Sequence, residues 1–307
     1  MRADLPANAG RSTHLGKQNR VIRRWFTHRA RSLPWRQNPV TGPHPQGWGV
    51  LVSEFMLQQT PVDRVLPAWT TWLKRWPAPS DLAASSAGEA ITAWGRLGYP
   101  RRALRLHAAA ERIAIEHADL VPADDAALRA LPGVGEYTSG AVRAFAYGQR
   151  ALALDTNVRR VIARHDLGQE FPTPSITRAE VEYADSIQPA GAGPASAWMA
   201  AIMELGALVC TARRPACEEC PVRGSCRWLA LGKPPGERPR RQAGYAGSDR
   251  QARGAILAVL RQAGAPVSQR RVDLAWPEAR QRARALDSLV ADGLVAPASR
   301  GRWQLPT

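Results

Sequence analysis

Apolar residues recur along this chain at the three-to-four-residue spacing of amphipathic helices, and alternating strand patterns are sparse. Proline and glycine gather in the intervening loops, most densely over 39–47 and 189–194. The alternation of strands and helices typical of TIM-barrel and Rossmann folds is absent, so we expect an all-α body. The pattern predicts helices over 50–58, 89–97, 102–116, 125–131, 138–147, 157–164 and 197–209.

A second module follows a linker rich in Pro, Gly and Arg, which we place at 230–248. Helical periodicity over 249–263 and 278–292 encloses a short segment at 268–275, and the chain closes with an apolar–turn–apolar pattern typical of a β-hairpin. Helix, helix, helix and hairpin is the order of a winged helix. We therefore expect a small winged-helix-like domain over 249–307, which either contacts DNA or docks a protein.

The charge of the chain indicates a polyanionic partner. The net charge is +16 and the isoelectric point is near 11, and residues 229–307 alone hold 14 basic and 6 acidic residues. Such a balance favours nucleic acid over small metabolites. No apolar run reaches transmembrane length, and residues 1–20 lack the apolar core of a secretory signal. We therefore expect a cytoplasmic protein with no membrane contact.

Four cysteines, the whole complement of the chain, lie within seventeen residues in the spacing C-x6-C-x2-C-x5-C. Disulfides fit poorly, because the sequence carries no secretory signal. A short segment brings thiolates together, and four of them suit a structural zinc ion or an iron–sulfur cluster. The spacing predicts a metal site without choosing between these two. Its ligands are Cys210, Cys217, Cys220 and Cys226.

The motif LPGVGEYT, residues 131–138, lies between two apolar helical patterns. Gly133 and Gly135 can adopt positive φ and let a phosphate approach the backbone amides. The N-terminus of the following helix directs its N–H groups at the same anion. This arrangement is a helix-hairpin-helix, which holds the DNA backbone without reading its sequence.

Asp155 follows the apolar, strand-like stretch 151–154 and precedes a predicted helix. An acid in that position is most often a helix N-cap. At this distance beyond a helix-hairpin-helix, its carboxylate would face the hairpin across one nucleotide. That placement suits catalysis at a sugar C1′ atom.

The hairpin, Asp155 and the cysteine loop together resemble the helix-hairpin-helix DNA glycosylase superfamily that carries an iron–sulfur cluster. The resemblance covers about residues 18–229 and implies a [4Fe–4S] cluster at the four cysteines. It also implies a six-helix barrel lobe over 41–150 and a cluster lobe built from 18–40 and 151–229, with DNA lying between the lobes. Four motifs are similar to those of MutY-type adenine DNA glycosylases: LPW (33–35), SEFMLQQTPV (53–62), WGRLGYPRRA (94–103) and ELGALVC (204–210).

The resemblance implies hydrolysis of the N-glycosidic bond of adenine mispaired with 8-oxoguanine or guanine. Glu54, which has apolar neighbours on nearly every side, matches the general acid that protonates the base. Burial raises the pKa of a carboxylic acid, as a general acid at neutral pH requires. Asp155 matches the carboxylate that stabilises the sugar cation or positions water, in keeping with the paired carboxylates of glycoside hydrolysis. Tyr137 and Asn157 match residues that support Asp155.

The remaining expected site residues bind DNA or the base. In the family, such residues probe or wedge the opposite base, line the adenine pocket or hold the phosphate at the hairpin. The implied partner is double-stranded DNA with A·8-oxoG or A·G mispairs, bound by a monomer at the bacterial nucleoid. The first group is Gln59, Thr60, Leu97 and Tyr99; the second is Trp35 and Arg36; and the third is Gly133, Val134 and Gly135.

Several features qualify the resemblance. Endonuclease III-type lyases have a Lys where this chain has Tyr137, so a monofunctional glycosylase is expected. The Nudix-like C-terminal domain that reads 8-oxoguanine in most MutY-type enzymes is replaced by the winged-helix pattern. Ala200 stands where a Gln or Glu often helps to read adenine, and the loop over 38–47 is longer than usual. The alternatives are a T·G or U·G mismatch glycosylase of the same superfamily and, more remotely, a non-catalytic iron–sulfur DNA-binding regulator.

Overall fold

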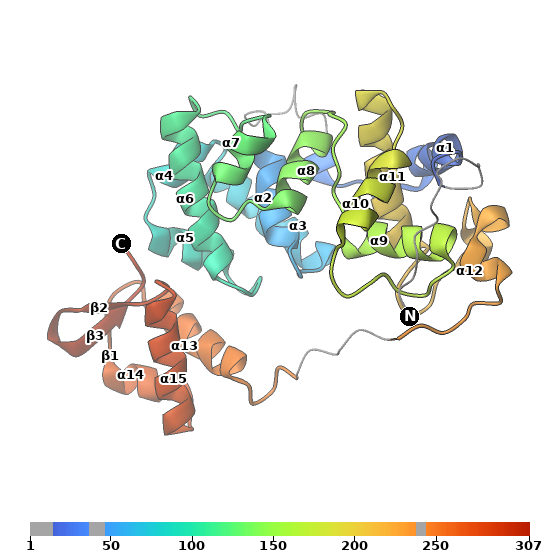
Figure 1. Ribbon diagram of the computed structural model, residues 1–307. Coiled ribbons are helices and arrows are strands. Elements are labelled where there is room, and N and C mark those ends of the chain that lie inside the picture. Colours follow the sequence, from blue (N-terminus) through green and yellow to red (C-terminus); the bar gives the residue numbers. More distant parts are fainter. Residues whose placement is uncertain (1–14, 37–46, 238–243) are drawn as a thin grey trace. The chain divides into compact units, whose positions relative to one another are not determined.

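The computed structural model describes residues 15–36, 47–237 and 244–307, and the chain divides into two compact units (Figure 1). Unit 1 comprises 1–38, 123–129 and 134–240, and unit 2 comprises 39–122, 130–133 and 241–307. The long loop expected over 38–47 lies outside the described residues, apart from Gly47. The lobe boundaries expected from the sequence at 41 and 151 stay a prediction.

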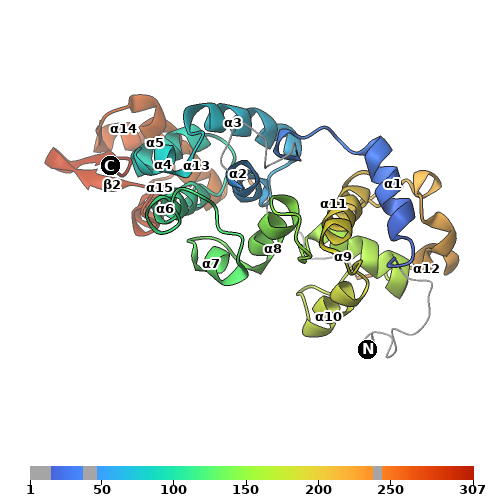
Figure 2. The same ribbon diagram turned by 90° about the horizontal axis from the view of Figure 1, so that it is seen from above.

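Unit 1 is built around one long helix, α11, which packs against α1, α8 and α9 (Figure 2). Trp198 and Ile202 of α11 are completely buried, as is Ile22 of α1. Burying these large side chains removes apolar surface from water and fixes the helices around α11. The helices of this unit are α1 (Asn19–Arg29), α7 (Asp125–Ala130), α8 (Glu136–Phe145), α9 (Thr156–Ile162), α10 (Arg178–Ser186), α11 (Ala192–Leu208) and α12 (Arg227–Ala230).

The first part of unit 2 is a helical bundle with a tryptophan-rich core. The rings of Trp72 and Trp94 meet edge to face with their centroids 5.6 Å apart, and the indole N–H of Trp48 donates to the carbonyl oxygen of Trp76 at 3.1 Å. Aromatic pairs of this geometry add to the stabilisation from burial. The helices are α2 (Trp48–Leu57), α3 (Val62–Arg75), α4 (Pro79–Ala83), α5 (Ala87–Trp94) and α6 (Arg101–Glu116).

The second part of unit 2 is the C-terminal domain, residues 244–307. Helices α13 and α15 pack against each other, and a small antiparallel sheet in the order β1-β3-β2 completes the domain (Figure 1). Trp303 of β3 pairs with Val267 on one side and with Pro297 on the other. The winged-helix prediction is confirmed, with one further short strand. The elements are α13 (Asp249–Ala263), β1 (Val267–Ser268), α14 (Gln269–Asp273), α15 (Ala279–Ala291), β2 (Ala296–Ala298) and β3 (Arg302–Gln304).

The helical periodicity located the predicted helices to within a few residues, and the all-α class is confirmed. Five helices, α1, α3, α4, α10 and α12, were not predicted. Helix α3 buries apolar residues at helical spacing but contains Pro67, which suggests a helix boundary, and α10 buries only Glu180 and Ala184 and so lacks an apolar stripe. The strand-like stretch 151–154 is extended but pairs with no strand in the described chain. None of the described helices has the length and apolar character needed to cross a bilayer.

Candidate active site and cysteine loop

Asp155 is the N-cap of α9, as the local sequence predicts. Its Oδ1 atom accepts hydrogen bonds from the backbone N–H groups of Asn157 at 2.9 Å and Val158 at 2.7 Å, and its Oδ2 atom accepts from the side-chain amide of Asn157 at 2.6 Å. Burial raises the pKa of Asp155, and these three donors, together with the nearby charge of Arg160, oppose the rise. The carboxylate is therefore held in one orientation by donors that favour its charged form.

Two glycines let the backbone around Asp155 pack closely against α8 and α11. A β-carbon on Gly140 of α8 would lie 1.8 Å from the carbonyl oxygen of Leu152, and one on Gly206 of α11 would lie 2.7 Å from that of Asn157. Real β-carbons do not approach backbone atoms so closely. Only glycine at both positions permits this packing, which sets where Asp155 lies between α8 and α11. Tyr137, on the first turn of α8, is half-buried against the same core.

Arg160 joins the Asp155 site to the first cysteine. Its guanidinium donates to the side-chain oxygen of Asn157 at 2.8 Å, to the carbonyl oxygen of Cys210 at 2.7 Å and to that of Gly206 at 2.7 Å. Burial lowers the pKa of Arg160, but the group remains a cation at neutral pH, because arginine retains its proton in proteins. A continuous run of hydrogen bonds therefore links Cys210, Arg160, Asn157 and Asp155.

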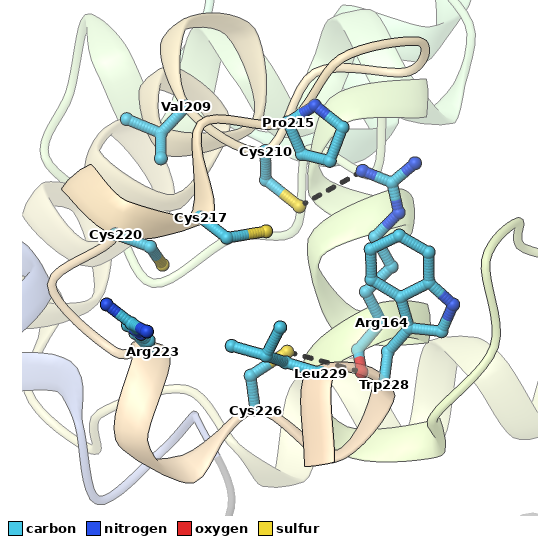
Figure 3. Close-up of a pocket in the computed structure, with 10 residues that line it drawn as sticks. All are labelled: Arg164, Val209, Cys210, Pro215, Cys217, Cys220, Arg223, Cys226, Trp228 and Leu229. Carbon is cyan, nitrogen blue, oxygen red and sulfur yellow. Dashed lines mark hydrogen bonds between the residues drawn. The ribbon is translucent and has the colours of Figure 1, made fainter. Parts of the chain in front are cut away.

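The four cysteines surround one cavity, and their sulfur atoms line it from different sides (Figure 3). Within the described ranges, no three Cys, His, Asp or Glu side chains converge closely enough to hold one metal ion. Four thiol groups around one cavity are the donor set that an iron–sulfur cluster takes. Burial raises the pKa of Cys220 to about 11, against a hydrogen bond from the backbone of Val222 and with a further contribution from the neighbouring cysteines, so a bound metal centre would favour the thiolate form of this residue.

Arg164 closes one side of this cavity (Figure 3). Its guanidinium stands over the ring of Trp228 at 4.7 Å, donates to the sulfur of Cys210 at 3.5 Å and donates to the carbonyl oxygen of Thr211 at 2.7 Å. A cation beside a thiolate favours its charged form. The cysteine loop is therefore held by α9 and by the π-helical turn Ala163–Leu167, which carries Arg164.

Glu54 lies on α2, in unit 2, and is 4% exposed. Helix α2 is buried on nearly all sides, with Val50, Leu51 and Phe55 each at most 3% exposed. The sequence left open whether Glu54 is buried or on the surface, and the structure places it in the interior.

Gln59 and Tyr99 occupy two neighbouring turns of unit 2 and share an unusual backbone conformation. Their φ angles are +58° and +47°, in the left-handed region that residues other than glycine rarely adopt, and both side chains are exposed. Such local strain tends to concentrate at functional sites, where the surrounding structure enforces it.

Arg102 supplies the constraint on both turns. The buried guanidinium donates to the carbonyl oxygens of Gln58 at 2.6 Å and Gly98 at 3.0 Å, and to the hydroxyl of Thr60 at 3.0 Å. Thr60 in turn donates to the carbonyl oxygen of Leu97 at 3.0 Å. Thr60 and Leu97 are buried, at 5% and 6% exposure, so of the four expected probes of the opposite base only Gln59 and Tyr99 are presented to solvent.

The two hairpin glycines differ. Gly133 has a φ of +84°, and a β-carbon there would lie 2.9 Å from atoms of Phe55 and Arg105. Gly135 has a φ of −103°, so the positive φ expected for it is wrong; it is the N-cap of α8, a position that favours extended backbone. A β-carbon on Gly135 would have no neighbouring atom within 4 Å, whereas the side chain of Val134 is buried. The hairpin therefore leaves room for a phosphate at the start of α8.

Trp35 and Arg36 form the short 3-10 helix Pro34–Arg36 in unit 1. Trp35 is buried, and the guanidinium of Arg36 pairs with the completely buried carboxylate of Glu204 at 2.8 Å. Burial alone would raise the pKa of Glu204, but hydrogen bonds from Arg31 and Arg36 lower it to about 2. Glu204, like Arg102 and Arg160, was missed as a site residue, since its partners are distant in sequence.

Comparison with known proteins agrees with this geometry. The profile of the HhH-GPD superfamily of base excision DNA repair proteins matches residues 52–185, and that of the iron–sulfur binding domain of endonuclease III matches residues 210–226. An adenine DNA glycosylase of Mycolicibacterium smegmatis is 48% identical over 282 residues, which cover 92% of this chain and 93% of the relative. The chain belongs to the adenine DNA glycosylase family.

Further relatives support the family assignment. An adenine DNA glycosylase of Mycobacterium tuberculosis is 48% identical over 285 residues, covering 92% of this chain and 91% of that protein. Among solved structures, a thermostable thymine-DNA glycosylase shares the fold, with a TM-score of 0.62 and 24% identity over 71% of this chain and 99% of the other. The mycobacterial alignments are too long to end before the linker, so they extend into the C-terminal domain of this chain.

Two sequence predictions are thereby confirmed. The resemblance to MutY-type adenine DNA glycosylases holds over most of the chain. The matched iron–sulfur domain runs from Cys210 to Cys226, so the cysteine loop of this family member holds a [4Fe–4S] cluster and not zinc. The roles of the individual site residues are developed below.

Proposed function

We propose that this protein is a monofunctional adenine DNA glycosylase of base excision repair, which releases adenine mispaired with 8-oxoguanine or guanine. The observation that carries the proposal is the near full-length identity with mycobacterial adenine DNA glycosylases, in a chain where Asp155 and Glu54 occupy suitable environments. The net charge of +16 fits a chromosomal DNA partner. We expect the active species to be a monomer.

The chemistry divides between two carboxyl groups. Glu54 donates a proton to a ring nitrogen of adenine, so that the bond from the base nitrogen to C1′ breaks and its electron pair leaves with the base. The carboxylate of Asp155 stabilises the positive charge that develops on the sugar. Water then adds to C1′ and loses a proton, which leaves an abasic site and free adenine. The buried position of Glu54 and the three donors on Asp155 suit these opposite tasks.

Cys210, Cys217, Cys220 and Cys226 would hold the cluster, which would then serve as a structural cross-link of the loop over 210–226 rather than as a catalytic metal. The residues around it hold the loop against α9. Through Arg160, the same contacts reach Asn157 and the carboxylate that it orients. The cluster site therefore supports the position of Asp155.

A lyase step is not expected. It requires an amine that attacks C1′ and forms a Schiff base with the sugar. The hairpin position that carries this Lys in endonuclease III-type enzymes is Tyr137, and the sequence contains no Lys between residues 75 and 232. The abasic site should therefore remain intact after base release.

Specificity for the opposite base is assigned to the two strained turns of unit 2. Gln59 and Tyr99 are exposed, and Arg102 fixes both turns from beneath. Because the backbone of both turns is fixed, less conformational freedom is lost when these side chains enter the base stack. The target adenine must leave the helix, and unstacking costs least at a mispair.

Base release from four duplexes tests the proposal. Purified full-length protein should release adenine from A·8-oxoG and A·G duplexes, without strand cleavage until the abasic site is treated with alkali. Release of thymine or uracil from T·G or U·G duplexes, with adenine left intact, would instead identify a mismatch glycosylase of the same superfamily. Binding without release of any base would indicate a regulator.

A further inference from the structure

The C-terminal domain is docked on the helical bundle of unit 2 by specific contacts. The backbone N–H of Gly88, on α5, donates to the carbonyl oxygen of Pro306 at 2.7 Å. A β-carbon on Gly88 would lie 2.5 Å from that oxygen, so α5 receives the C-terminal segment only because residue 88 is glycine. Arg101, at the start of α6, pairs with Asp292, which follows α15, at 3.2 Å. These contacts place α13 opposite the turn that carries Tyr99.

A groove of about 1280 Å³ lies between the two parts of unit 2. One wall is formed by Gln58 and Gln59 and by the segment from Gly95 to Arg102. The other wall is formed mainly by residues along the length of α13. These are Arg250, Gln251, Arg253, Gly254, Ala255, Leu257, Ala258, Arg261 and Gln262. None of the described residues of α15 itself lines the groove.

The groove is strongly basic. Among the described residues that line it are eight arginines and one carboxylate, that of Asp292. Asp292 is already engaged, because it pairs with Arg253 at 2.6 Å as well as with Arg101. The eight arginines are Arg64, Arg96, Arg101, Arg102, Arg105, Arg250, Arg253 and Arg261. Such a surface concentrates anions.

Arg261 brings a partly buried guanidinium to the groove. Its Nε atom is buried and has no hydrogen-bond partner within the described parts of the chain, and burial lowers the pKa of the guanidinium to about 10. An anion in the groove would supply a counter-charge and further hydrogen-bond acceptors to this cation. The arginine fork matches the oxygens of a phosphate group.

We propose that this groove binds the sugar–phosphate backbone of the DNA strand that carries the opposite base, and that α13 is the DNA-facing helix of the C-terminal domain. This inference rests on the proposed function. It departs from the usual docking of a winged helix, in which the third helix, here α15, enters the major groove. Gln59 and Tyr99 line the same groove, so backbone contacts from α13 position the strand whose base those two residues probe.

An acidic peptide is the other ligand that eight arginines could attract. The aromatic and amide side chains in the groove favour nucleic acid. Tyr245 and Trp276 line the groove together with Tyr99, and exposed aromatic rings stack on unpaired bases. Gln59 and Gln262 supply hydrogen-bond donors and acceptors suited to base edges and phosphates.

Matched double variants of the full-length protein test which helix faces DNA. Arg250→Gln with Arg261→Gln removes two charges from α13, and Arg280→Gln with Arg284→Gln removes two from the exposed face of α15. Affinity for a labelled A·8-oxoG duplex is measured by fluorescence anisotropy across a salt series. The α13 pair should lower the log–log salt slope by about 1.8, at about 0.9 for each lost phosphate contact, and the α15 pair should leave it unchanged.

A gain of negative charge provides a second test, independent of any loss of stability from the arginine substitutions. Ala258→Glu places a carboxylate on the groove face of α13, and Ala283→Glu places one on the exposed side of α15. The first should weaken DNA binding by about tenfold or more, and the second by much less. Circular dichroism and iron content confirm folding of each variant.

The outcomes separate the inference from the proposed function. Equal salt slopes for wild type and the α13 pair, or a loss confined to the α15 pair, would overturn the inference even if adenine is released normally. Absence of adenine release by the wild type would reject the proposed function, while the salt slopes would still decide which helix meets DNA. An acidic peptide that competes with DNA only in the wild type, with unchanged DNA affinity in the α13 pair, would assign the groove to a protein partner.

Discussion

The guanidinium of Arg160 donates to the side-chain oxygen of Asn157 at 2.8 Å, and the amide of Asn157 donates to Asp155 at 2.6 Å. The amide thus has its orientation fixed on both sides, because its oxygen can only accept and its nitrogen can only donate. Asp155 receives its third hydrogen bond through this arrangement. The expected effects of substitutions at Asn157 and Arg160 depend on these hydrogen bonds.

Replacing either proposed catalytic carboxyl group should stop base release and spare DNA binding. Asp155→Asn and Glu54→Gln each keep the shape of the side chain and remove its acid–base function. Loss of a general acid alone costs about 10²–10⁴ in rate. Single-turnover excision from an A·8-oxoG duplex measures the rate, and anisotropy measures binding. Excision at the wild-type rate in either variant would refute that residue's role.

Asn157→Ala should move the acid limb of the pH–rate profile to higher pH. Asp155 acts in its charged form, so excision falls as pH drops through the pKa of that group. Burial already raises the pKa of Asp155, and the Asn157 side chain opposes the rise. Removing that donor should raise the pKa further. Single-turnover rates across the acid range measure the shift, and an unchanged acid limb would argue against the contact.

Arg160→Gln should impair both the cluster and catalysis, because one side chain holds the carbonyl of Cys210 and the amide of Asn157. Loss of a residue that orients ligands and their neighbours costs about tenfold or more in binding or activity. Iron content and visible absorbance report on the cluster, and single-turnover excision reports on the site. Arg178→Gln is the matched control, since its ion pair with Glu182 is exposed. Full iron retention with normal excision would show that the connection is not functional.

Tyr137→Lys should introduce some strand cleavage. A lysine amine at this hairpin position can attack C1′ as the base leaves, and the resulting imine permits elimination of the 3′ phosphate. Borohydride should trap the imine as a covalent protein–DNA adduct. Tyr137→Phe, which lacks an amine, should form no adduct. A Tyr137→Lys protein that excises adenine but never cross-links would show that residue 137 does not reach C1′.

The sequence reveals contacts that are local and misses those that are distant. Asp155 as an N-cap, the cysteine loop and the C-terminal hairpin each depend on neighbours within a few residues. Arg102 and Glu204 contact groups up to 47 and 173 residues away, and nothing in their own neighbourhoods marks them. Helix α3 was missed for a different reason, because Pro67 interrupts its interior and suggests a boundary where the helix continues.

The sequence could identify candidate site residues but could not tell which of them are buried. The family resemblance identified Gln59, Tyr99, Thr60 and Leu97 together but could not indicate that Thr60 and Leu97 are buried. Burial depends on how the two turns pack over Arg102, which the linear pattern does not contain. The resemblance carried the identities of these positions, and the structure separates the exposed pair from the buried pair.

Gly140 and Gly206 make the reaction vulnerable to the smallest possible change in the chain. Neither has a side chain, so neither takes part in the chemistry, yet a single methyl group on either would collide with the backbone next to Asp155. Alanine at these positions would preserve charge, polarity and every group that faces DNA. It would nevertheless displace the carboxylate of Asp155 from its position in the site. Harm from inherited or acquired substitutions in this enzyme therefore cannot be judged by chemical similarity or by distance from the substrate, since a conservative change in the interior can silence repair.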